Sequence, residues 1–121
     1  MKTIIIDLDN TITIENRTIE YQNKTPNLQI VEKLNKYKEE DWKIIIFTSR
    51  NMNTYNGDVS LITKNTLPVI EKWLAKHKVP YDEIILGKPW PGKEGFYVDD
   101  RSIRPDEFLN LTSTQISNLL K

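Results

Sequence analysis

Four short runs of hydrophobic residues recur along the chain, separated by longer segments rich in polar and charged residues. The runs contain many β-branched and aromatic residues, and none alternates cleanly between hydrophobic and polar positions. Continuous runs of this length are typical of strands in a parallel sheet whose two faces are both covered. Strands are therefore expected at Thr3–Leu8, Lys43–Thr48, Glu83–Leu86 and Phe96–Val98.

Helical patterns lie between and after these runs. Thr25 is a suitable cap for a helix with Pro26 in its first position, where the missing amide hydrogen does no harm. A second helix is expected to begin near Asn65, with Pro68 tolerated in its first turn. The last helix is expected from the capping box Thr112–Gln115. The predicted buried faces of the three helices are Ile30, Val31, Leu34 and Tyr37, then Val69, Ile70, Trp73 and Leu74, and finally Ile116, Leu119 and Leu120.

The alternation of strands and helices predicts βαβ units. It favours an α/β fold of three Rossmann-like layers, with helices on both faces of a parallel sheet. No repeat, low-complexity stretch or linker divides the chain, and 121 residues are enough for one hydrophobic core. We therefore expect a single domain over residues 1–121.

Polar side chains follow every predicted strand at its carboxyl end, where parallel sheets of this kind bind their ligands. Four independent placements at the same edge indicate one site more strongly than any single motif does. The residues are Asp7, Asp9 and Thr11 at the end of the first run, Thr48, Ser49 and Arg50 at the end of the second, Lys88 beyond the third, and Asp99 and Asp100 beyond the fourth.

The residue types at this edge suit phosphoryl transfer, in which catalysis consists mostly of positioning and of neutralising negative charge. Asp7 is the candidate nucleophile. Asp9 lies two residues further on, so an extended backbone would place its carboxyl on the same side, ready to act as acid and base. Thr48 and Lys88 would contact the phosphoryl oxygens, and Lys88 would also help to keep the clustered carboxylates ionised.

A divalent cation is expected as well, because a carboxylate cannot attack a phosphate dianion unless a cation offsets their repulsion. Mg²⁺ takes hard oxygen ligands and accepts a phosphate oxygen directly, with Asp7 and Asp99 as the side-chain ligands. The chain has no cysteine and a single histidine, His77, which excludes thiolate sites and sites with several histidines.

The ordered set Asp-x-Asp-x-Thr, Thr-Ser, Lys and Asp-Asp resembles the four motifs of the haloacid dehalogenase superfamily over roughly residues 3–104. The resemblance implies the roles given above and a phospho-aspartate on Asp7. It also implies that Mg²⁺ is ligated by Asp99 and by the backbone carbonyl of Asp9, with Asp100 as a supporting or alternative ligand. One departure is Asn10, where the family usually has glycine. Asparagine tolerates left-handed backbone geometry best among the other residues, so we expect the change to be accommodated.

The short connections between the motifs leave no room for the large cap domain that many members of this superfamily carry. Ile12–Tyr21 is long enough for a β-hairpin flap, and the open site then suits a large substrate or a partner that closes over it.

The segments Arg50–Gly57, Leu86–Trp90 and Phe96–Arg101 resemble small bacterial phosphatases linked to capsule and polysaccharide biosynthesis. That resemblance implies a phosphorylated sugar or polysaccharide precursor as substrate. Thr11, Ser49 and Arg50 are expected to contact it, although capping or loop hydrogen bonds explain Arg50 equally well.

The overall charge is balanced, with 17 basic and 17 acidic residues, which disfavours general binding to nucleic acid or to anionic membranes. No run approaches the length of a membrane span, and Asp7 and Asp9 interrupt the N-terminal hydrophobic run too early for a signal peptide. We therefore expect a cytoplasmic protein.

Three other functions use similar residues. A phospho-accepting signalling module uses the same residue types: an acidic pair, a phospho-accepting aspartate, a threonine or serine, and a lysine. Its acidic pair follows the first strand, whereas here Asp99 and Asp100 come last. A phosphatase acting on polynucleotide ends is disfavoured by the neutral charge. A binding module without activity is disfavoured because every expected catalytic residue type is present.

Overall fold

The structure is a computed structural model that describes residues 2–121. The chain divides into two compact units, the first ending at Trp90 and the second spanning Pro91–Lys121, and each is described by itself. The first unit contains β1 (Thr3–Ile6), the short 3₁₀ helix η1 (Tyr21–Asn23), α1 (Leu28–Glu39), β2 (Lys43–Phe47), α2 (Val59–Asn65), α3 (Leu67–Lys76) and β3 (Glu83–Ile85). The second contains α4 (Pro105–Asn110) and α5 (Ser113–Leu119).

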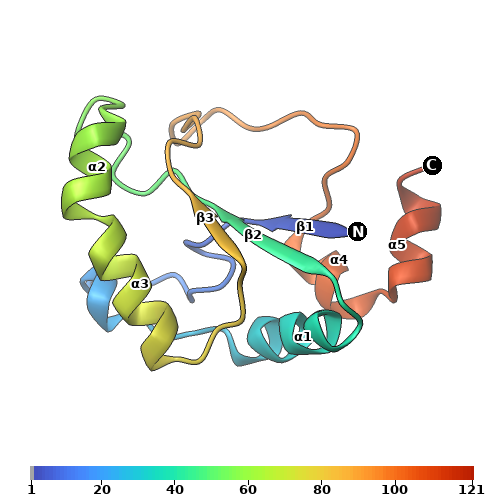
Figure 1. Ribbon diagram of the computed structural model, residues 1–121. Helices are drawn as coiled ribbons and strands as arrows, with labels where there is room; N and C mark the ends of the chain where they lie inside the picture. The colour runs from blue at the N-terminus through green and yellow to red at the C-terminus, as the bar shows by residue number, and fades with distance from the viewer. Residues whose placement is uncertain (1) are drawn as a thin grey trace. The chain divides into compact units, whose positions relative to one another are not determined.

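The first unit is an α/β structure built on a parallel sheet of three strands in the order β1-β2-β3. Figure 1 shows β2 between its two neighbours, with α2 and α3 following one another along one side. The register pairs Ile6 with Ile46, and both side chains are buried on one face of the sheet. On the opposite face Ile45 is half-buried and Ile5 is 65% exposed, so this face is covered less completely than the other.

The buried faces of the helices in the first unit agree closely with their hydrophobic pattern. All four core residues predicted for α1 are buried, as are three of the four predicted for α3, Val69 being half-buried. The predicted start of α1 is wrong, because Asn27 and not Thr25 is its N-cap, with the Asn27 side chain accepting a hydrogen bond from the backbone N–H of Ile30. α2 was not expected from the sequence. Pro68 lies in the first turn of α3, as predicted.

The loop from β1 to α1 is tied together at its base. The structure has no strand within Ile12–Tyr21, so the hairpin flap expected there is not seen. Thr13 instead forms one isolated antiparallel bridge with Pro26, which lies outside that segment. Next to it the backbone N–H of Ile14 donates to the carbonyl of Thr25 at 2.8 Å. The indole N–H of Trp73 in α3 donates to the carbonyl of Lys24 at 2.8 Å, which fixes the end of the loop onto the helix.

In the second unit, Phe96–Val98 has no regular secondary structure, so the predicted fourth strand is wrong for this structure. A run of three residues after the turn at Gly92–Glu94 can form few ladder hydrogen bonds of its own and needs a paired neighbour to become a strand. The capping box of α5 is present as predicted, with Thr112 and Gln115 bonded reciprocally. Its predicted buried face is wrong, since no residue of α5 is buried. No helix formed by residues 2–121 is long and hydrophobic enough to cross a bilayer.

Candidate functional site

The turn after β1 presents two carboxylates on either side of a fully buried leucine. The chain folds back around the carbonyl of Leu8, which accepts hydrogen bonds from the backbone N–H groups of Ile12 at 2.9 Å and Thr13 at 3.0 Å. Leu8 has no exposed surface, whereas Asp7 and Asp9 on either side of it are only partly buried. Their side chains are 36% and 23% exposed.

Asn10 makes this turn possible. Its φ of 61° is left-handed, a conformation that asparagine tolerates better than most other non-glycine residues. Its backbone N–H donates to the hydroxyl of the buried Thr13 at 3.0 Å. The prediction that Asn10 would accommodate the missing glycine is therefore confirmed.

Backbone hydrogen bonds beyond the named strands bring Thr48 and Lys88 to the same edge of the sheet. The N–H of Thr48 donates to the carbonyl of Ile85 at 3.0 Å, and the N–H of Lys88 donates to the carbonyl of Thr48 at 3.1 Å. Gly87, the residue before Lys88, adopts a φ of 82°, a left-handed conformation that favours glycine. Lys88 Nζ then lies 3.8 Å from Asp7 Oδ1, so residues from the ends of β1, β2 and β3 meet.

Burial is the main cause that raises the pKa of Asp7 above its ordinary value of 3.8, and the neighbouring charge of Asp9 adds to this. Lys88 opposes the shift by stabilising the ionised form, and a hydrogen bond with the side chain of Thr11 acts in the same direction. Two neighbouring carboxylates, one of them half-buried, supply hard oxygen donors. This donor chemistry fits Mg²⁺.

Arg50 is one of the few buried polar side chains of the structure. Its guanidinium forms a bidentate ion pair with Asp9, with Nε 3.0 Å from Oδ2 and Nη2 2.7 Å from Oδ1. The ring of Tyr21 stacks on it, with the ring centroid 4.2 Å from Arg50 Cζ. Thr48 completes the group, because its hydroxyl accepts a hydrogen bond from the backbone N–H of Arg50 at 3.1 Å. Ser49, between them, is half-buried.

Asp99 and Asp100 lie in the second unit, and both are exposed. Asp99 Oδ1 accepts a hydrogen bond from the backbone N–H of Arg101 at 2.7 Å, and this bond is the main cause that lowers the pKa of Asp99. Among residues 2–121, no three histidine or carboxylate side chains are gathered closely enough to hold a metal ion. The predicted participation of Asp99 and Asp100 in a metal site with Asp7 therefore stays a prediction.

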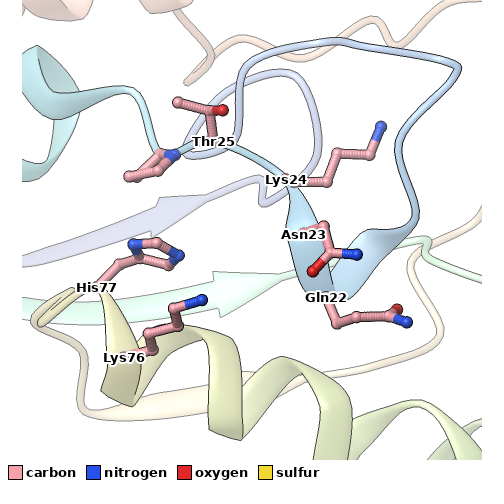
Figure 2. A pocket seen from close by; sticks show the side chains of 7 residues that line it. Gln22, Asn23, Lys24, Thr25, Lys76 and His77 are labelled. Carbon is pink, nitrogen blue, oxygen red and sulfur yellow. The ribbon is translucent and has the colours of Figure 1, made fainter.

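A separate hollow of about 260 Å³ contains none of the predicted site residues (Figure 2). It lies between the loop before α1 and the end of α3. The lining residues are Gln22, Asn23, Lys24, Thr25, Pro26, Lys76 and His77. Burial and the adjacent charge of Lys76 lower the pKa of His77, which was given no catalytic role in the sequence analysis.

Tyr21 is the residue at this edge that the sequence analysis missed. It is a single aromatic residue in a polar loop, and no local pattern there indicates its contact with Arg50, 29 residues further along the chain. Thr13 was missed for the same reason. In both cases the partner is determined by how the loop after β1 returns to α1.

The comparison with solved structures finds relatives of high and of low sequence identity. No protein-family model and no curated protein matches the sequence. A crystal structure of a protein target from Vibrio cholerae is 48% identical, with a TM-score of 0.96 over 99% of this chain and 97% of that one.

Two distant structures share the fold alone. D,D-heptose 1,7-bisphosphate phosphatase from B. bronchiseptica, solved with magnesium and phosphate, is 15% identical with a TM-score of 0.50 over 78% of this chain and 54% of that one. A chain of the Pnkp1/Rnl/Hen1 complex is 24% identical with a TM-score of 0.53 over 70% of this chain and 27% of that one. The fold of this chain is thus similar to that of both structures over most of its length.

Proposed function

This chain belongs to the same family as the Vibrio cholerae protein, and we propose that it is a Mg²⁺-dependent phosphatase that hydrolyses phosphomonoesters through a phospho-aspartate on Asp7. One observation carries the proposal. Asp7, Asp9, Thr48 and Lys88 come from three separate segments and lie at one edge of the sheet, with Lys88 3.8 Å from the proposed nucleophile.

The reaction has two steps. Asp7 attacks phosphorus while the bond to the leaving oxygen breaks, and Asp9 donates its proton to that oxygen. Asp9 then takes a proton from the water that attacks the phospho-aspartate, and the bond between phosphorus and Asp7 breaks. Inorganic phosphate leaves, and both carboxyl groups return to their starting forms.

Other residues of the chain would bind the phosphoryl group and the metal ion during this reaction. Lys88 and the hydroxyl of Thr48 hold the phosphoryl oxygens, with Thr11 and Ser49 close by. Mg²⁺, when bound, offsets the repulsion between the Asp7 carboxylate and the phosphate dianion. Asp7, Asp99 and the backbone carbonyl of Asp9 would hold it, with Asp100 as a supporting or alternative ligand.

The first test is phosphate release from a generic aryl phosphate. We expect turnover with Mg²⁺, none with excess chelator, and none in the Asp7→Asn variant, whose amide cannot attack phosphorus. Asp9→Asn should retain a residual rate, lower by roughly 10²–10⁴. Full activity of Asp7→Asn, or of the wild type in chelator, would contradict the mechanism. A protein that labels itself once and then stops would be a signalling module instead.

The proposed substrate is a phosphorylated sugar or a polysaccharide precursor. The heptose bisphosphate phosphatase with this fold acts on a sugar phosphate, which supports that class. The Pnkp1-containing complex makes polynucleotide ends the alternative, against which the balanced charge counts. A parallel screen of sugar phosphates and of end-phosphorylated oligonucleotides, read by phosphate release, separates the two. Higher kcat/KM on the oligonucleotides would reverse our assignment.

A further inference from the structure

Arg50 donates one hydrogen bond to each oxygen of the Asp9 carboxylate, which leaves a second lone pair on each oxygen for proton transfer. Its Nε and Nη2 donate to different oxygens at 3.0 and 2.7 Å, which is the fork geometry that suits a guanidinium and a carboxylate. The Arg50 side chain is only 1% exposed, against 23% for Asp9. A substrate that reaches Asp9 from solvent would therefore meet the carboxylate, with Arg50 behind it.

Tyr21 holds the Arg50 guanidinium from another direction. Its ring covers the guanidinium at 4.2 Å, a distance typical of stacking between the two groups. Tyr21 begins η1, whose following residue Lys24 is fixed to α3 by the hydrogen bond from Trp73. The loop after β1 therefore reaches Asp9, the proposed acid, through Arg50. Tyr21 of the loop contacts Arg50, and Arg50 contacts Asp9.

We propose that Arg50 is a positioning residue for Asp9, and that Tyr21 in turn positions Arg50. The inference rests on the proposed function, since it assigns Asp9 the proton transfers. Asp9 follows β1 in a tight turn, and its side chain has rotational freedom unless a partner holds it. A bidentate partner fixes both the position and the plane of the carboxyl, and small errors in such geometry are costly to proton transfer.

A direct role of Arg50 on the substrate phosphate fits the contacts less well. Two of its three nitrogens already bond Asp9, and Nη1 is buried. Nη1 is the one buried side-chain nitrogen or oxygen in residues 2–121 that has no hydrogen-bond partner. A phosphate group in solvent would therefore not reach Nη1 without a change in the structure around it.

The test compares aryl phosphates whose leaving groups differ in basicity. Dinitrophenolate leaves without being protonated, whereas phenolate requires the acid. If Arg50 acts through Asp9, Arg50→Met should lower kcat/KM by about 10²-fold for phenyl phosphate and by less than about 10-fold for dinitrophenyl phosphate. Arg50→Lys keeps the charge but loses the fork, so its losses should be intermediate.

A double-mutant cycle sharpens the test. In the Asp9→Asn background, Arg50→Met should cost little further activity on phenyl phosphate, because the group that Arg50 positions is already gone. Tyr21 is 37% exposed, so Tyr21→Leu should disturb the core little and should reproduce the leaving-group dependence more weakly. Tyr21→Phe should lose less activity than Tyr21→Leu, because it keeps the ring. Arg17→Met is the matched control, since Arg17 is in the same loop and pairs only with Glu15 among the contacts described.

The outcomes are distinguishable. Equal losses on all leaving groups in the Arg50 and Tyr21 variants, or additive losses in the double mutant, would overturn the positioning role. A wild-type protein without turnover on any of these esters would overturn the proposed function itself.

Discussion

At the scale of single residues, Asp82 shows how one side chain links a helix to the sheet. Its carboxylate accepts two hydrogen bonds from Lys38 Nζ at 2.8 and 2.9 Å, and one from the backbone N–H of Ile44 at 2.7 Å. The bonds from Lys38 are the main cause that lowers the pKa of Asp82, and the Ile44 bond acts in the same direction. The folded state therefore favours the ionised form.

Because that pKa is lowered, the stability contributed by Asp82 is present above its ordinary value of 3.8 and is lost as the pH falls through the folded value. Asp82→Asn should lower the free energy of unfolding by roughly 1 kcal/mol near pH 7, and the difference should shrink as the pH falls below 3.8. Urea denaturation between pH 7 and pH 3 measures it. Glu71→Gln, on the exposed side of α3, is the control, and a pH-independent difference for Asp82→Asn would refute the explanation.

Residues whose role is local could be predicted from the sequence, whereas those with distant partners could not. The left-handed backbone of Asn10 follows from residue type and position alone. The pair between Arg50 and Asp9 joins residues 41 positions apart, and it depends on how two strand ends converge. Sequence reasoning therefore placed Arg50 at the correct edge but left its partner undetermined.

At the scale of elements, the start of α1 allows a direct comparison of the predicted and observed caps. The Asn27 side chain accepts the hydrogen bond from Ile30, whereas Thr25 lies before the helix. Asn27→Ala should therefore lower the free energy of unfolding by about 1 kcal/mol, and Thr25→Ala by much less. Chemical denaturation of both variants measures the difference. The opposite order would restore Thr25 as the cap.

Elements with a strong hydrophobic stripe were predictable, and short or weakly patterned ones were not. The core residues of α1 and the first-turn proline of α3 follow from spacing. α2 buries a single side chain, Ile62, so it carries no stripe to detect. Phe96–Val98 has the composition of a strand, but composition does not supply a pairing partner.

At the scale of the whole molecule, the proposed metal site makes the stability of the folded chain depend on Mg²⁺. If Mg²⁺ binds through Asp7 and Asp99, it should stabilise the folded chain by about 2.7 kcal/mol at 100 times its Kd, which raises Tm by several degrees. Asp99→Asn should abolish most of this shift, while Asp106→Asn, an exposed carboxylate of the same unit, should keep it. A full shift in Asp99→Asn, measured by thermal unfolding with and without Mg²⁺, would remove Asp99 from the site.

The tied base of the loop between β1 and α1 also affects how this fold can accept inserted residues in evolution. The bridge between Thr13 and Pro26 holds the two ends of the loop together, while its tip at 15–18 is exposed. The entropy of closing a loop grows only slowly with its length, by about 0.6 kcal/mol for each doubling. Extra residues at this tip would therefore leave the sheet and its carboxylates undisturbed, so the chain can lengthen at this point without any change to the rest of its fold.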